Sequence, residues 1–255
     1  MPGSSSHVTA AVVVIGNEIL SGRTRDSNLA YLARGLNEVG IRVREARVIP
    51  DVEGVIVETV NTLRARHAYV FTTGGIGPTH DDITAASVAK AFGVPLERNA
   101  DAVRRLQAYY ARPEVSAGLT EARLRMANVP CGAELLDNPV SGAPGFRMEN
   151  VYVLAGVPSI MEAMFGAIKP HLRGGAVVRT REIVVYLPES EVARTLSRLQ
   201  ERYPDVEMGS YPFVRGGRFG TSLVLRSSET TRLAEAATAL EQGIRELGVE
   251  PERSR

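Results

Sequence analysis

Short apolar runs alternate with amphipathic stretches through residues 8–173. A valine-rich run at residues 10–15 predicts a buried strand. The apolar positions after it recur at helical spacing up to Gly40, behind a candidate cap at Ser27. The same step repeats, with strands predicted at 43–49, 68–72, 134–136 and 151–154 and helices at 53–66, 83–92 and 159–172. This alternation predicts a three-layer α/β domain over residues 8–173, in which helices cover a parallel sheet.

One stretch inside this domain departs from the alternation. Residues 100–127 have helical spacing that is interrupted by Pro113 and Gly118. Because proline and glycine end helices, the pattern predicts two helices that leave the sheet as an excursion.

The pattern changes after the glycines at 174 and 175, which we interpret as a hinge. A strand is predicted at 182–187, a helix at 189–203, a hairpin over 207–214 and 221–225, and a final helix at 230–247. This βαββα order predicts a small α+β domain at 176–250, in an order like that of KH domains.

A KH domain would clamp nucleic acid in a GXXG loop between helices. The tetrad Gly217-Arg218-Phe219-Gly220 has that form but falls in the predicted hairpin. Residues 176–255 also contain 12 arginines and 12 acidic residues, so a basic surface is not expected. We therefore expect no nucleic-acid partner.

Composition narrows the class of protein further. The 255 residues have a formal net charge of +1, which argues against a polyanion-binding protein. The single cysteine, Cys131, excludes an intrachain disulfide and a multi-cysteine metal cage, and a free thiol fits a reducing compartment. The apolar runs have the length of strands, and no signal peptide is evident. We expect a cytoplasmic protein without a membrane partner.

Candidate chemistry lies in the loops that follow the predicted strands, because ligands of α/β sheets bind at the carboxyl ends of strands. Three such loops, at residues 16–22, 72–82 and 155–159, contain glycine and polar residues. The second has glycines at 74, 75 and 77 and leads into a helix, whose N-terminal N–H groups suit a phosphate. The alternative is a tight turn without a ligand.

Asp81 and Asp82 follow these glycines directly. A carboxylate about 5 Å from a phosphate charge would cost about 3 kcal/mol at an effective dielectric of about 20. A divalent cation such as Mg²⁺ or Mn²⁺ between the carboxylate and the phosphate would turn this repulsion into attraction. Carboxylates and substrate phosphate are common ligands of such cations. The alternative is that one aspartate caps the helix that starts near Ile83.

Other candidates each have a structural alternative. His80 is a base, a metal ligand or a hydrogen-bonding loop residue. Asp51, after the second strand, and Glu18, in the first loop, are site acids or helix caps. The loop 138–145 faces a ligand or is a surface turn. The sequence lacks a G-x-x-x-x-G-K-[ST] loop, a G-x-S-x-G elbow and a G-x-G-x-x-G turn, which disfavours P-loop kinase, serine hydrolase and ordinary nicotinamide-binding functions.

The segments 16–22, 72–84 and 156–159 together resemble the molybdopterin-binding domain of the MoaB/Mog type, most of all the amino-terminal domain of the competence-damage protein CinA. The match covers roughly residues 8–172. The segment 203–212 resembles the part that follows the corresponding domain in eukaryotic FAD synthases. The chain length leaves no room for the deamidase domain of CinA or the adenylyltransferase domain of FAD synthases, so neither activity is expected.

The resemblance implies roles for particular residues. It places Asp82 on the metal-linked aspartate of the Mog motif and Asp51 on the acid after the second strand. Asp81 matches the CinA branch, whereas the Mog branch has a basic residue there. This departure favours the nucleotide-hydrolysing relatives over those that adenylylate a pterin. Relatives of this kind are usually homo-oligomers, so we expect a homo-oligomer here.

Loops and resemblance together define the predicted site. The candidate catalytic residues are Asp51, His80 and Asp82, and the candidate metal ligands are Asp81 and Asp82. The candidate ligand-binding residues are Gly16, Asn17, Glu18, Ser21, Thr73, Gly74, Gly75, Gly77, Thr79, Gly142, Gly156 and Pro158.

Three functional hypotheses follow. The first is a protein that binds molybdopterin or a nucleotide diphosphate. The second, implied by the resemblance, is a pyrophosphatase that needs Mg²⁺, Mn²⁺ or Co²⁺ and acts on ADP-ribose or FAD, with Asp51 or His80 positioning a water. The third is a non-catalytic interaction module.

Overall fold

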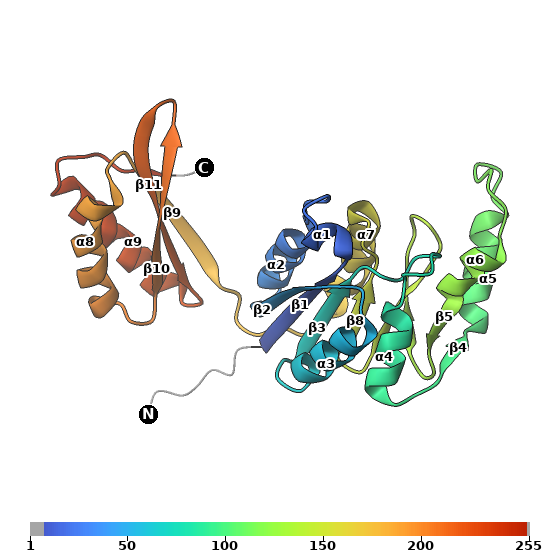
Figure 1. Ribbon diagram of the computed structural model, residues 1–255. Helices are drawn as coiled ribbons and strands as arrows, with labels where there is room; N and C mark the ends of the chain where they lie inside the picture. Colours follow the sequence, from blue (N-terminus) through green and yellow to red (C-terminus); the bar gives the residue numbers. More distant parts are fainter. Residues whose placement is uncertain (1–7, 254–255) are drawn as a thin grey trace. The chain divides into compact units, whose positions relative to one another are not determined.

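The computed structural model describes residues 8–253, which divide into two compact units on either side of the Gly175–Ala176 bond (Figure 1). Each unit has its own sheet and its own buried apolar core.

A six-stranded mixed sheet forms the centre of the first unit, in the order β2-β1-β3-β8-β7-β6. The strands are β1 (Val8–Ile15), β2 (Ile41–Ile49), β3 (Tyr69–Thr73), β6 (Glu134–Leu136), β7 (Gly145–Met148) and β8 (Val151–Leu154). The first four in sheet order are parallel, as predicted, whereas β7 and β6 are antiparallel. Only Glu149 and Asn150 join β7 to β8, and a two-residue connection forces antiparallel pairing.

Helices cover both faces of this sheet, which confirms the predicted three-layer α/β domain (Figure 1). One face packs against α2 (Asn28–Glu38) and α7 (Pro158–Ile168), and the other against α3 (Glu53–Arg64) and α4 (Thr84–Phe92). Successive β1 residues alternate between the two cores. The continuous apolar run at 10–15 is therefore explained by burial of both faces.

The start of α2 differs from the prediction. The Ser27 side chain makes no capping hydrogen bond. Instead, the Asp26 carboxylate accepts hydrogen bonds from the N–H groups of Asn28 and Leu29, at 3.3 and 3.1 Å. The cap lies one residue earlier because Ser27 has a near-helical backbone conformation.

The stretch 96–130 departs from the six-stranded sheet, as predicted. It contains β4 (Leu96–Arg98), α5 (Ala100–Tyr110), α6 (Glu121–Leu124), a 3₁₀ turn η1 (Arg125–Ala127) and β5 (Asn128–Pro130). We call this stretch the excursion. Its own small core is formed by Ala102, Leu106 and Ala127. The β4–β5 pair was not predicted, because three-residue strands are too short to show an alternating pattern.

Four other short elements of the described chain were also not predicted: β7, α1 (Asn17–Leu20), η2 (Lys169–His171) and β12 (Glu252–Arg253).

The second unit has the predicted βαββα order. Its elements are β9 (Arg179–Val185), α8 (Glu189–Arg202), β10 (Glu207–Arg215), β11 (Arg218–Ser227) and α9 (Thr230–Arg245), and β12 follows. The sheet order is β10-β11-β9-β12, and every pairing is antiparallel. The tetrad that begins at Gly217 lies in the β10–β11 hairpin, outside any connection between two helices.

An ion pair on the second unit predicts a pH-dependent stability. The Arg232 guanidinium donates two hydrogen bonds to Asp205, at 2.9 and 3.0 Å, and so holds the pKa of that carboxyl below its ordinary value of 3.8. Because the folded pKa is the lower one, the ionised carboxylate stabilises the fold above about pH 4, and this contribution is lost as the pH falls through the folded pKa. Since the pair is exposed, we expect Asp205→Asn to lower the free energy of unfolding by about 0.5–1 kcal/mol at pH 7.

Urea unfolding of the two proteins at pH 7 and at pH 3 measures this effect. The difference should shrink toward zero at pH 3, and a difference of equal size at both pH values would contradict the assignment to Asp205 ionisation.

Candidate functional site

A cavity of about 620 Å³ opens at the carboxyl ends of the parallel strands of the first unit. The loops after β1, β2, β3 and β8 all contribute to its lining, as does the loop before β7. Three residues of the excursion, Tyr110, Arg123 and Met126, complete it. The predicted loops thus meet at one edge of the sheet.

Gly74 sits where the end of β1, the loop after β3 and the loop after β8 come together. Its φ is +102°, and a Cβ there would lie 2.2 Å from the Ile15 carbonyl oxygen. A Cβ on Gly156 would in turn lie 3.2 Å from the Cα of Gly74. The Thr84 hydroxyl donates to the Gly74 carbonyl at 3.0 Å and ties the loop to the first turn of α4. A residue without a side chain is required at this crossing.

Asp81 and Asp82 converge on Thr79. The Thr79 hydroxyl oxygen lies 2.6 Å from one Asp81 oxygen and 2.5 Å from one Asp82 oxygen, and the Thr79 N–H donates to Asp82 at 2.8 Å. A hydroxyl has a single proton, so it can satisfy only one of the two carboxylates at a time. The two carboxylates are therefore held close together, and one of them lacks a proton from the Thr79 hydroxyl at any time.

The alternative role of these aspartates as helix caps is wrong. Ile83 is the N-cap residue of α4, and no side chain caps that helix. Hydrogen bonding from the Thr79 hydroxyl, and then from backbone, holds the pKa of the Asp81 carboxyl below its ordinary value. Asp81 is consequently ionised at neutral pH, as a ligand for a cation must be.

Asp51 connects two of the loops. Its carboxylate accepts a hydrogen bond from the Asn17 N–H, at 2.9 Å, across the ends of β1 and β2. It does not cap α3, where Val52 is the N-cap residue and no side chain caps the helix. Asp51 and Glu18 line the cavity together with Asp81 and Asp82.

The charge around the cavity is unbalanced. Four carboxylates line it, whereas among the described lining residues the only lysine or arginine is Arg123. No group of three or more histidine, cysteine, aspartate or glutamate side chains is placed to hold a metal ion within residues 8–253. The donor set still fits a Mg²⁺-like cation, which commonly takes one or two carboxylates and completes its shell with water and substrate phosphate.

The structure brings most of the predicted site residues to the cavity. Those that line it are Gly16, Glu18, Asp51, Gly74, Gly75, Gly77, Thr79, Asp81, Asp82, Gly156 and Pro158. Those outside its lining are Asn17, Ser21, Thr73, His80 and Gly142. His80 is exposed, Thr73 is buried in β3, and the side-chain position of Gly142 faces Tyr109.

Residues of the excursion were missed as site residues. Tyr110, Arg123 and Met126 belong to a stretch whose helical pattern indicates only an amphipathic surface. A tyrosine and an arginine on such a surface carry no local signal for a ligand, so sequence reasoning could not find them.

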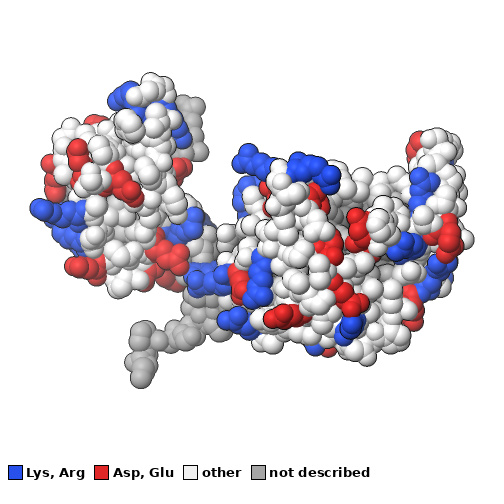
Figure 2. Space-filling view, viewed as in Figure 1, with Lys and Arg blue, Asp and Glu red and all other residues white. Residues whose placement is uncertain are grey.

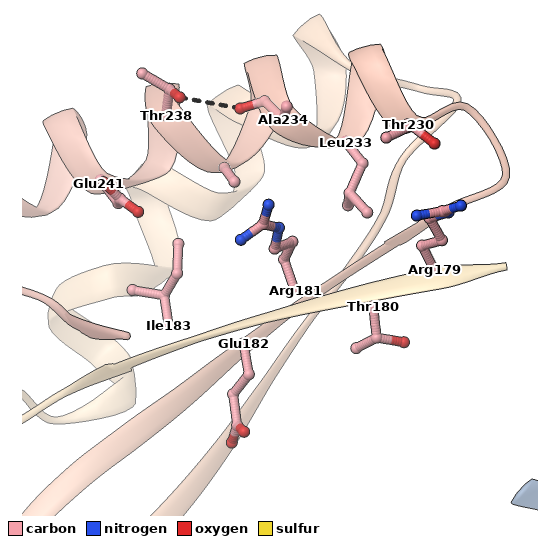
Figure 3. Close-up of a pocket in the computed structure, with 11 residues that line it drawn as sticks. Arg179, Thr180, Arg181, Glu182, Ile183, Thr230, Leu233, Ala234, Thr238 and Glu241 are labelled. Carbon is pink, nitrogen blue, oxygen red and sulfur yellow. Dashed lines mark hydrogen bonds between the residues drawn. The ribbon is translucent and has the colours of Figure 1, made fainter. Parts of the chain in front are cut away.

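The second unit contains a larger cavity, of about 780 Å³, between β9 and α9. Arg179 and Arg181 extend from β9 on the side of α9 (Figure 3). Among its described lining residues there is no glycine and no aspartate, so it lacks the groups that suit a phosphate and a cation in the first unit.

Surface charge is mixed. Both basic and acidic side chains are present on the visible face of each unit (Figure 2). Within the described residues, no helix is both long enough and apolar enough to span a membrane.

The first unit therefore belongs to the class of three-layer α/β domains with a ligand cavity at the carboxyl ends of parallel strands. Comparison with known families specifies it further: residues 11–174 match the family described as probable molybdopterin binding domain, and residues 177–253 match the middle domain of FAD synthase. The chain belongs to the molybdopterin-binding-domain family, which confirms the resemblance in its sequence.

Individual relatives agree with this assignment. The chain is 40% identical to a protein of Aeropyrum pernix, over 95% of this chain and 96% of the relative. It is 31% identical to a probable FAD synthase of Caenorhabditis elegans, over 94% of this chain but only 51% of that relative. The crystal structure of the protein CinA of unknown function from Thermoplasma acidophilum superposes with a TM-score of 0.59 at 34% identity, over 65% of this chain and 99% of that one.

Proposed function

We propose that the first unit binds a pterin or nucleotide diphosphate, with the diphosphate on the Gly74–Gly77 loop and a divalent cation on Asp81 and Asp82. The observation that supports this most directly is the pair of carboxylates that meet at the single Thr79 hydroxyl, beside a glycine loop at the edge of the cavity. Membership of the molybdopterin-binding-domain family supports a pterin ligand, and the match to the middle domain of FAD synthase supports a nucleotide as the alternative.

The electrostatics of the cavity favour a cation. A diphosphate among four carboxylates is repelled, and one arginine cannot offset that charge. When bound, Mg²⁺, Mn²⁺ or Co²⁺ would neutralise the phosphate oxygens and polarise the phosphorus centre. The chain itself would supply N–H groups from the glycine loop, which need no basic surface.

A second candidate is hydrolysis of the diphosphate in a dinucleotide such as ADP-ribose or FAD. The clustering of acids favours it, because a site that only binds an anion gains nothing from extra carboxylates. Asp51 lines the cavity and is held by the Asn17 N–H, so it could orient a water, whereas His80 is exposed and lies outside the lining. The similarity to FAD synthases supports FAD as a substrate to test, and ADP-ribose is the dinucleotide that the sequence resemblance implies.

Incubation of the purified chain with ADP-ribose, FAD, NAD or ATP, each with Mg²⁺, Mn²⁺ or Co²⁺, separates the two candidates. The pyrophosphatase predicts cation-dependent release of nucleoside monophosphate from ADP-ribose or FAD, detected by chromatography. Binding without turnover predicts saturable calorimetric titration of a dinucleotide, or of molybdopterin under anaerobic conditions, and intact ligand afterwards. Absence of both turnover and saturable binding over the whole panel would refute the proposal.

A further inference from the structure

One wall of the cavity comes from the excursion and not from any loop that follows a sheet strand. Tyr110 is the last residue of α5, Arg123 lies in α6, and Met126 lies in the 3₁₀ turn after it. All three line the same cavity as the Gly74–Asp82 loop. A diphosphate on the Gly74–Gly77 loop gives none of them a role.

Apart from Arg123, this wall is apolar, and Ala143 from the loop before β7 continues it. Tyr110, Met126 and Ala143 are partly buried and pack against the small core of the excursion, and the same three residues line the cavity. The cavity therefore combines a polar part, with glycines and carboxylates, and an apolar part with an aromatic ring. A simple diphosphate uses only the first of these.

Arg123 is held against the ring of Tyr110. Its guanidinium carbon lies 4.9 Å from the ring centroid, within the range of a cation–π contact. The same guanidinium donates a hydrogen bond to the Gly118 carbonyl oxygen. The two side chains are thus positioned as a pair before any ligand arrives, which lowers the entropy that binding would cost.

The excursion is tied to the rim of the cavity. Arg105 of α5 forms an ion pair with Asp137 at 2.5 Å, just before the loop that contributes Asn138 and Ser141 to the lining. Tyr109 packs closely against Gly142: a Cβ added to Gly142 would lie 2.5 Å from the Cβ of Tyr109. These contacts connect α5, which ends at Tyr110, to the rim.

We infer that Tyr110 and Arg123 form a subsite for the planar heteroaromatic ring of the ligand whose diphosphate binds at the glycine loop. This inference rests on the proposed function and extends it to a second part of the same ligand. A purine, pterin or isoalloxazine ring presents a flat face that stacks on tyrosine and on a guanidinium plane, whatever its edge pattern. Arg123 also brings the cavity lining a positive charge, which attracts an anionic ligand.

The test compares ligands that have a ring with one that lacks it. ADP-ribose, FAD and molybdopterin, and separately inorganic pyrophosphate, are titrated with Mg²⁺ into the full chain and its variants. Tyr110→Ala should weaken binding of the ring-bearing ligand about 10-fold or more and change pyrophosphate binding less than about 2-fold. Tyr110→Phe keeps the stacking face and should bind the ring-bearing ligand within about 2-fold of the unmodified chain. Arg123→Met should weaken binding of the ring-bearing ligand more than that of pyrophosphate, because it removes a stacking plane as well as a positive charge.

The matched control is Tyr211→Ala, which removes an exposed tyrosine of the second unit and should change neither affinity. Circular dichroism and thermal unfolding show that each variant is folded. Equal losses for pyrophosphate and the ring-bearing ligands, or no loss in Tyr110→Ala, would overturn the ring subsite and leave the diphosphate site standing. Failure of the unmodified chain to bind any of these ligands would overturn the proposed function and the subsite with it.

Discussion

Asp82→Asn is expected to weaken cation-dependent ligand binding or turnover by about 100-fold or more. Asparagine has nearly the same shape, and its oxygen can still accept the hydrogen bond that the Thr79 N–H donates to Asp82 at 2.8 Å. What it lacks is the negative charge that would hold the cation beside Asp81. The fold should survive the change, because Asp82 caps no helix and is only partly buried.

Titration of Mn²⁺ in the presence of ligand, followed by electron paramagnetic resonance, measures the loss directly. Asp101→Asn is the matched control, because it makes the same chemical change at an exposed residue outside the cavity lining. Unchanged cation affinity in Asp82→Asn would place the cation elsewhere. Loss of affinity in both variants would indicate a general charge effect.

Gly74→Ala should be the most destabilising single change in the loop. A φ of +102° costs a residue with a Cβ about 1–3 kcal/mol, and that Cβ would lie only 2.2 Å from the backbone oxygen of Ile15. The Ile15 carbonyl oxygen lies at the end of β1 and cannot move away as a flexible side chain could. We therefore expect the free energy of unfolding of the first unit to fall by about 3 kcal/mol. Urea denaturation followed by far-ultraviolet circular dichroism measures it.

Gly54→Ala provides the comparison. Gly54 lies in α3, has no atom within 4 Å of the added Cβ and does not require a positive φ. Alanine there should be neutral or slightly stabilising because it favours helix. If the two variants unfold at the same urea concentration, the close approach of Gly74 to Ile15 is not a determinant of stability. A folded Gly74→Ala that binds ligand normally would likewise contradict the role of this crossing.

Much of the fold was predictable because its signals are local. The apolar run at 10–15, the helical spacing after it and the stop at Gly40 are each properties of a few neighbouring residues. Their repetition was enough to predict a parallel sheet with helices on both faces, and the βαββα order of the second unit followed in the same way. The strand predicted at 134–136 is β6, whereas β7 and the antiparallel pairing of both strands were missed, because a four-residue strand carries little pattern and pairing direction is not a local property.

The glycine and aspartate residues of the site were predictable for a similar reason. Gly74, Gly77, Asp81 and Asp82 lie within nine consecutive residues, and this composition indicates phosphate and cation chemistry before any fold is known. Their partners were not predictable. The link between Asp51 and the Asn17 N–H joins residues that are 34 positions apart, and it replaces the helix cap that the local sequence suggests.

The sequence by itself determined the layered architecture, the order of the longer elements in both units and the loop that contains the glycines and paired carboxylates. Only the tertiary structure decided which groups meet there: the convergence of Asp81 and Asp82 on one hydroxyl, the four carboxylates around one cavity, and the wall formed by Tyr110 and Arg123. The physical reason is that periodicity and turn chemistry act over a few residues. The lining of a cavity instead depends on side chains that are distant along the chain and are brought together by packing, as Tyr109 of α5 packs against Gly142 of the rim.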